Sequence, residues 1–77
     1  MNYGIIEQHD GVIWHMIRGR AFTNKISHLY PPTTFKERID AEMTIYFLES
    51  FRGPADERRP EIVKLGKTPI GVYFESD

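Results

Sequence analysis

The chain has 77 residues, no cysteine and a net charge of −1, from 10 Lys and Arg against 11 Asp and Glu. This length suits one hydrophobic core, so residues 1–77 are predicted to form a single domain, and the lack of cysteine excludes disulfides and thiolate zinc sites. The balanced charge argues against the strongly basic surface of most nucleic-acid-binding domains and against an acidic mimic of nucleic acid.

The first residues, MNYGIIEQHDG, lack the basic region and apolar run of a signal peptide. No apolar run approaches the roughly 20 residues that a membrane span needs. The sequence therefore predicts a cytoplasmic protein without a membrane partner.

Two apolar runs rich in β-branched and aromatic residues come first, at 3–8 (YGIIEQ) and 12–18 (VIWHMIR). Asp10-Gly11 between them predicts a two-residue hairpin turn, because both turn positions need a positive φ. This turn would place Glu7 opposite Trp14.

The two faces of this predicted hairpin both carry apolar residues. One face has Tyr3, Ile5, Glu7, Trp14, Met16 and Arg18, and the other has Ile6, Gln8, Ile13, His15 and Ile17. A single helix covers one face of a sheet, so the second apolar face indicates a binding partner.

The segment that follows is predicted to be a third strand and a connector. Residues 20–26 (RAFTNKI) have a strand-like composition, with a turn at Asn24-Lys25. Residues 27–34 (SHLYPPTT) are predicted to be irregular, because two consecutive prolines favour extended backbone.

The longest predicted element is a helix over residues 34–54 (TFKERIDAEMTIYFLESFRGP). Thr34 and Glu37 have the spacing of a capping box at its start. Gly53-Pro54 predicts its end, because glycine accepts a positive φ there and proline cannot continue the helix.

This helix has two apolar stripes where an ordinary two-layer domain needs one. The stripe predicted to face the core consists of Phe35, Ile39, Met43, Tyr46 and Phe47. The second stripe, roughly opposite, consists of Ala41, Ile45 and Leu48. Because the first stripe would fill the core, the second is predicted to bind a partner.

A charged loop at 55–60 and two short strands at 61–65 and 70–75, joined by Gly66-Lys67-Thr68-Pro69, complete the chain. The elements then follow the order ββ(β)αββ. The predicted fold is α+β, with an antiparallel sheet of four or five strands packed on one long helix.

Sites for chemistry are weakly indicated. Gly66-Lys67-Thr68 resembles the end of a phosphate-binding loop, but Glu61 stands where the motif needs glycine, and a strand is predicted where it needs a helix. The three histidines have no metal-ligand spacing, so neither a metal nor a cofactor is expected. His15 could serve as a general base in a small ribonuclease-like enzyme, although the predicted hairpin points it away from Glu7.

A nucleic-acid surface is the stronger alternative to an enzyme. Arg18, Arg20 and Lys25 could bind phosphates while Tyr30 stacks on a base, which is how many proteins hold single strands. The near-neutral charge of the whole chain favours this hypothesis less than protein binding.

The sequence therefore predicts a non-enzymatic module that binds another protein, either as a monomer or as a homodimer. Its predicted contact residues are Trp14, Ala41, Ile45, Leu48 and Tyr73. Small chains of this kind act as inhibitors or adaptors of larger protein machines, and phage inhibitors of host defence, including anti-CRISPR proteins, are one such class.

Overall fold

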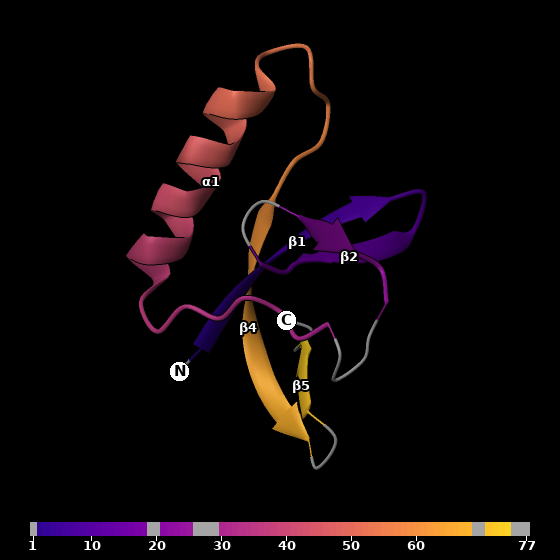
Figure 1. The fold of residues 1–77 in the computed structure, drawn as a ribbon, viewed down its shortest axis with the longest axis vertical. Coiled ribbons are helices and arrows are strands. Elements are labelled where there is room, and N and C mark those ends of the chain that lie inside the picture. Colours follow the sequence, from indigo (N-terminus) through magenta and orange to yellow (C-terminus); the bar gives the residue numbers. More distant parts are fainter. Residues whose placement is uncertain (1, 19–20, 26–29, 69–70, 75–77) are drawn as a thin grey trace.

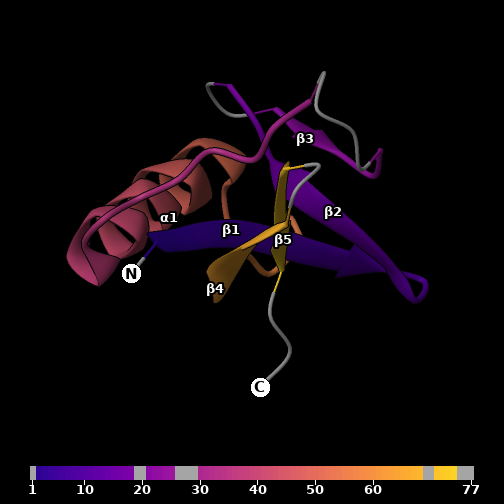
Figure 2. The same cartoon turned by 90° about the horizontal axis from the view of Figure 1, so that it is seen from below.

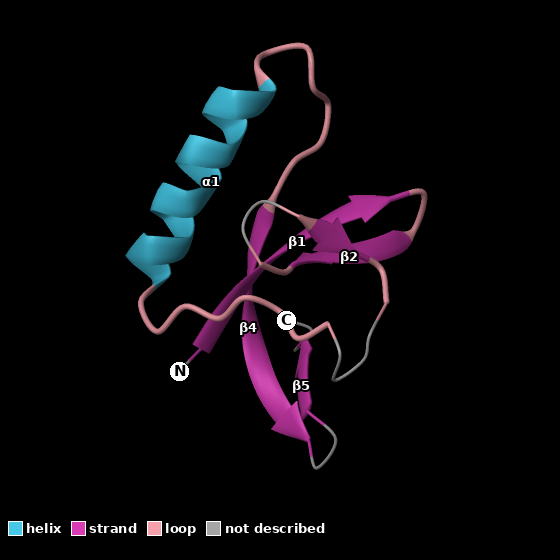
Figure 3. Cartoon of the chain, in the orientation of Figure 1, coloured by secondary structure: helices cyan, strands magenta, loops and turns pink. Residues whose placement is uncertain are grey.

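The computed structural model describes residues 2–18, 21–25, 30–68 and 71–74, with residues 66–68 and 71–74 described by their backbone alone. The elements are β1 (Asn2–His9), β2 (Val12–Met16), β3 (Phe22–Thr23), α1 (Arg38–Arg52), β4 (Glu61–Thr68) and β5 (Gly71–Phe74) (Figure 1). The strands form one antiparallel sheet in the order β3-β2-β1-β4-β5. Figure 3 shows the single helix of the described chain beside this sheet. The predicted α+β class and element order are confirmed.

The first hairpin has the predicted turn and register. Asp10 and Gly11 both have positive φ, at 51° and 80°, and the strands on either side pair Glu7 with Trp14. A two-residue turn with two left-handed positions matches the twist of the strands, which is why Asp-Gly was a reliable signal.

The second hairpin is longer than predicted. β4 continues to Thr68, so Gly66, Lys67 and Thr68 lie in a strand paired with β5 and not in the predicted turn. Pro69 lies outside the described residues. An extended strand does not gather successive N–H groups around one anion, so these residues do not form a phosphate loop.

The helix begins four residues later than predicted. Phe35 pairs with Tyr3 through two backbone hydrogen bonds of 2.7 and 2.8 Å, and this bridge holds residue 35 in extended backbone. The N-cap is Glu37, and no side chain caps the helix there, so the predicted capping box of Thr34 and Glu37 is wrong. β2 ends at Met16, which leaves the edge of β1 at Tyr3 available to the connector.

The helix ends where the sequence predicts. Gly53 has a φ of 78°, and its N–H donates to the Glu49 carbonyl at 3.0 Å. Glycine adopts this φ without the steric cost that a side chain would bring.

The core lies between α1 and one face of the sheet (Figure 2). Its fully buried members are Ile5, Met16, Ala41 and Leu48, with Phe22, Phe35, Ile45 and Ile62 packed around them. The predicted orientation of the helix is therefore wrong, because the stripe of Ala41, Ile45 and Leu48 faces the sheet. Of the stripe predicted to fill the core, only Phe35 packs against it.

The second face of the hairpin is partly covered within the chain. Ile6 and His15 lie on the sheet face away from α1 and are buried. The connector runs beside the end of β2, where Thr33 donates from its N–H to the Met16 carbonyl and from its hydroxyl to the Ile17 carbonyl. Ile13, on the same face, is 42% exposed, so the chain covers this apolar face only in part.

Candidate functional site

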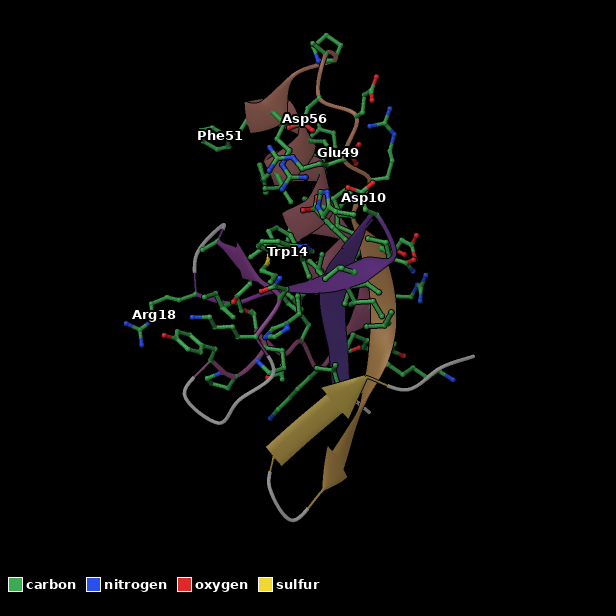
Figure 4. All side chains as sticks on the ribbon, turned by 90° about the vertical axis from the view of Figure 1, so that its right-hand side faces the viewer. Asp10, Trp14, Arg18, Glu49, Phe51 and Asp56 are labelled. Atoms are coloured by element: carbon green, nitrogen blue, oxygen red, sulfur yellow. The ribbon has the colours of Figure 1, made fainter. Side chains whose placement is uncertain are left out.

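Most of the exposed large apolar side chains among the described residues lie on the side of α1 that points away from the sheet. We call it the outer face. It consists of five side chains with high exposed fractions: Ile39 58%, Met43 47%, Tyr46 65%, Phe47 57% and Phe51 69%. Their spacing of i, i+4, i+7, i+8 and i+12 makes one continuous stripe along the helix. Figure 4 shows Phe51 projecting outward from the last turn.

The opposite side of the helix, the inner face, explains why the outer face is left uncovered. It consists of Ala41, Ile45, Leu48 and Arg52, spaced i, i+4, i+7 and i+11. Ala41 is 0% exposed, and such a small residue lets the helix approach the sheet closely. Arg52 also lies on this face, and its side chain pairs with a residue of the sheet.

That partner is Glu7, which is 1% exposed and lies on the sheet face toward the helix. Both Glu7 oxygens accept hydrogen bonds from the Arg52 guanidinium, the longer being 3.1 Å from Nη2 to Oε1. The guanidinium also lies 5.3 Å from the centre of the Phe22 ring. This bidentate pair joins the first hairpin to the last turn of α1, across 45 positions of sequence.

Further polar groups surround this pair. Asp56 Oδ2 lies 3.8 Å from Arg52 Nε, and His9 Nε2 lies 3.7 Å from Glu7 Oε1. His9 also packs edge-on against Trp14, with ring centres 5.9 Å apart. The Arg52 guanidinium is therefore shared between the Glu7 and Asp56 carboxylates.

The loop after the helix borders a hollow of about 430 Å³. Its lining residues are Glu49, Ser50, Arg52, Gly53, Pro54, Asp56, Arg58 and Arg59. Hydrogen bonds from the Arg58 side chain and backbone hold the pKa of Asp56 well below its usual range. The Arg59 guanidinium donates to the carbonyls of Asp56 and Arg58. Asp56, Arg58 and Arg59 in the lining of this hollow are thus paired within the loop.

The predicted interface stripe is not available to a partner. Ala41 and Leu48 are fully buried and Ile45 is partly buried, all against the sheet, because Arg52 in the same stripe pairs with Glu7. Trp14 is half-buried. The side chain of Tyr73 lies outside the described ones.

The predicted nucleic-acid residues are brought together only in part. Lys25 Nζ lies 5.8 Å from the centre of the Tyr30 ring, and both side chains are exposed. Arg18 is exposed and extends from the end of β2, as Figure 4 shows. Arg20 lies outside the described residues.

His15, the predicted catalytic base, is 2% exposed. Its Nε2–H donates to the Tyr30 carbonyl at 3.0 Å, and the register places it on the face opposite Glu7. A general base has to come within hydrogen-bond reach of a substrate proton, and this buried position gives His15 no such access.

In the described part of the chain, no three metal-ligating side chains gather into a potential site. The helix in that part is too short and too polar to cross a bilayer.

No protein-family model, curated protein or solved structure matches this chain.

The sequence reasoning identified four of the five outer-face residues as a stripe but assigned them to the core, and it omitted Phe51. Phe51 continues the stripe four residues after Phe47, and Arg52 continues the stripe of Ala41, Ile45 and Leu48.

Proposed function

We propose that this chain is a small non-enzymatic module that binds another protein through the outer face of α1. One observation carries this proposal: five large apolar side chains lie exposed in a continuous stripe along the helix. Contiguous apolar surface of this kind usually marks an interaction site. The stripe has the spacing of a helix that inserts into an apolar groove of its partner.

The expected energetics suit such a role. Given side chains that bury about 150–250 Å² each, the exposed fractions correspond to roughly 500–700 Å² of apolar surface. Burial at about 25 cal/mol per Å² would contribute roughly 12–18 kcal/mol before the costs of association are subtracted. The helix is already folded against the sheet, so its backbone needs little further ordering on binding.

The biological role that we propose is that of an inhibitor or an adaptor of a larger protein machine in the cytoplasm. Such a role requires a surface that binds to the partner and blocks or bridges one of its sites, and it requires no catalytic group. Phage-encoded inhibitors of host defence, such as anti-CRISPR proteins, remain the class to which we assign it as a hypothesis.

The test is retention of proteins from a lysate of the source cell on the immobilised native chain and on two variants. Phe47→Glu places a charge in the middle of the outer face. Gln8→Glu adds the same charge at an exposed position on the sheet face away from the helix. We expect the native chain and Gln8→Glu to retain the same protein and Phe47→Glu to lose it. Equal retention by all three would refute the proposal.

The nucleic-acid hypothesis gives a different result. Binding through Arg18, Lys25 and Tyr30 would weaken steeply as salt rises and would be lost in Tyr30→Ala. It would be unaffected by Phe47→Glu. A fluorescent single-stranded oligonucleotide titrated at low and high salt distinguishes the two.

A further inference from the structure

The outer face has the area that a small dimer needs. It runs from Ile39 in the first turn to Phe51 in the last, which is about 18 Å of helix at 1.5 Å per residue. Two copies of its roughly 500–700 Å² would bury about 1,000–1,400 Å² in total. Stable interfaces begin near about 1,200 Å².

The outer face is also unequal along its length in a way that suits antiparallel pairing. Its first half carries the aliphatic side chains Ile39 and Met43, and its second half is aromatic, with the Tyr46 and Phe47 rings packed edge-to-face at 5.8 Å. Consider a two-fold axis that crosses the middle of the stripe at the height of residue 45 along the helix. It would set Ile39 of one copy against Phe51 of the other. It would likewise set Met43 against Phe47, and thioether–aromatic contacts are favourable.

Parallel pairing would fit less well, because aromatic side chains would face aromatic ones and aliphatic side chains would face aliphatic ones. The aromatic ends would then crowd together while the aliphatic ends stayed apart. An antiparallel pair also opposes the two helix dipoles. A closed two-fold arrangement uses one surface on both copies, which is the commonest symmetry of soluble oligomers.

The charges beside the stripe do not add to the affinity of this arrangement. Arg38, Glu42 and Glu49 lie along one border of the outer face, and Arg38 Nε lies 3.3 Å from Glu42 Oε1. In an antiparallel pair this border faces its own copy, so Glu42 comes almost level with Glu49 of the second copy, and the Arg38 beside each Glu42 offsets part of that repulsion. Exposed ion pairs add little free energy, so the apolar contacts would supply most of the affinity.

We infer that the outer face of α1 binds a second copy of this chain, with the two helices antiparallel about a two-fold axis near residue 45. This inference rests on the proposed function, because both use the same side chains. Another protein that binds the outer face then has to displace the second copy, and self-association regulates access to the site.

The first test is the mass of the purified protein in solution, by sedimentation equilibrium from low to high micromolar concentration. The native chain and Gln8→Glu are expected at twice the chain mass of 9.0 kDa. Phe47→Glu is expected at the monomer mass, with the thermal transition that the native chain shows at concentrations low enough to make it monomeric. Tyr46→Lys, at another highly exposed position, gives a second readout if Phe47→Glu does not fold. A native chain that is monomeric at every concentration overturns the inference.

The second test is the direction of pairing, which the lack of cysteine makes accessible. Ile39→Cys and Phe51→Cys are purified separately, mixed, and treated with a short thiol-specific crosslinker. An antiparallel pair crosslinks the mixture and leaves each variant alone uncrosslinked, because identical positions are then about 18 Å apart. Crosslinking of Ile39→Cys to itself shows a parallel pair and overturns the proposed geometry.

These tests separate the two proposals. A native chain that is monomeric in the first test, yet loses its retained protein in Phe47→Glu, contradicts self-association and supports the proposed function. A dimer that Phe47→Glu dissociates, with no change in the proteins retained, supports self-association and contradicts the proposed function.

Discussion

The inner and outer faces of α1 are both apolar, yet only one of them is core. The inner face is built from Ala41, Ile45 and Leu48, which are of modest size. The outer face holds larger side chains, three of them aromatic. Side-chain size and hydrophobicity alone would predict that the outer face packs against the sheet. In the structure, the inner face packs there instead.

We infer from this difference that the Glu7–Arg52 pair contributes to the orientation of this helix. Glu7 lies on the sheet face that the helix covers, and a buried carboxylate needs a cation and hydrogen bonds. Arg52 lies in phase with the inner face and supplies both. With the outer face turned inward, Glu7 would meet Met and Phe side chains and have no counter-ion.

The largest expected effect therefore comes from breaking this pair. Arg52→Met should destabilise the fold by about 3–5 kcal/mol, because it leaves Glu7 buried without its cation. A domain of this size has only roughly 4–12 kcal/mol of stability, so this is a severe loss. Urea unfolding followed by circular dichroism measures it.

The matched control for this change is Arg38→Met, which removes an exposed arginine from the same helix. We expect it to cost under about 1 kcal/mol. Adding Glu7→Gln to Arg52→Met should restore part of the lost stability. Equal costs for the two arginines would show that the Glu7–Arg52 pair does not orient the helix.

The next largest expected difference in stability is between variants of Leu48 and Phe47, which are neighbours on opposite faces of the helix. Leu48→Ala should cost about 2–5 kcal/mol, because it leaves a cavity in the core. Phe47→Ala removes the larger side chain but should change the stability of the monomer by no more than about 0.5 kcal/mol. Because a dimer would add to apparent stability, both variants should be unfolded at low protein concentration. A larger loss from Phe47→Ala would reverse the assignment of the two faces.

Enlarging the inner face should have a moderate effect. Ala41→Leu inserts a bulky side chain where the helix lies closest to the sheet, and overpacking of this kind costs about 1–3 kcal/mol. Glu42→Leu makes an exposed position of the same helix turn apolar and serves as the control. Thermal unfolding of both variants shows whether the close approach at Ala41 is needed.

The smallest expected effect is a pH dependence at the loop after the helix. The pKa of Asp56 is lowered by its hydrogen bonds to Arg58, so its ionised form stabilises the fold. That contribution is full above the ordinary carboxyl pKa of about 4 and is lost as pH falls toward the lower pKa of the folded state. Asp56→Asn should therefore lower the melting temperature at pH 7, with a difference that shrinks below about pH 4. A difference that grows in acid would contradict the assignment.

The sequence by itself determined the local features of this protein. The Asp10-Gly11 turn fixed the register of the first hairpin, and Gly53 fixed the end of the helix, because each depends on backbone angles that few residues adopt. The α+β class followed from the order of the periodic segments. The presence of two apolar helix faces was also visible in the spacing of the residues.

Only the tertiary structure decided which of these faces is core and where the helix begins. Both depend on contacts between residues far apart in the sequence: Glu7 with Arg52, and Tyr3 with Phe35. A local capping motif at Thr34 was overridden by two backbone hydrogen bonds to β1. The stripe of large apolar residues faces outward in the same structure in which the buried carboxylate of Glu7 pairs with Arg52 on the other side of the helix.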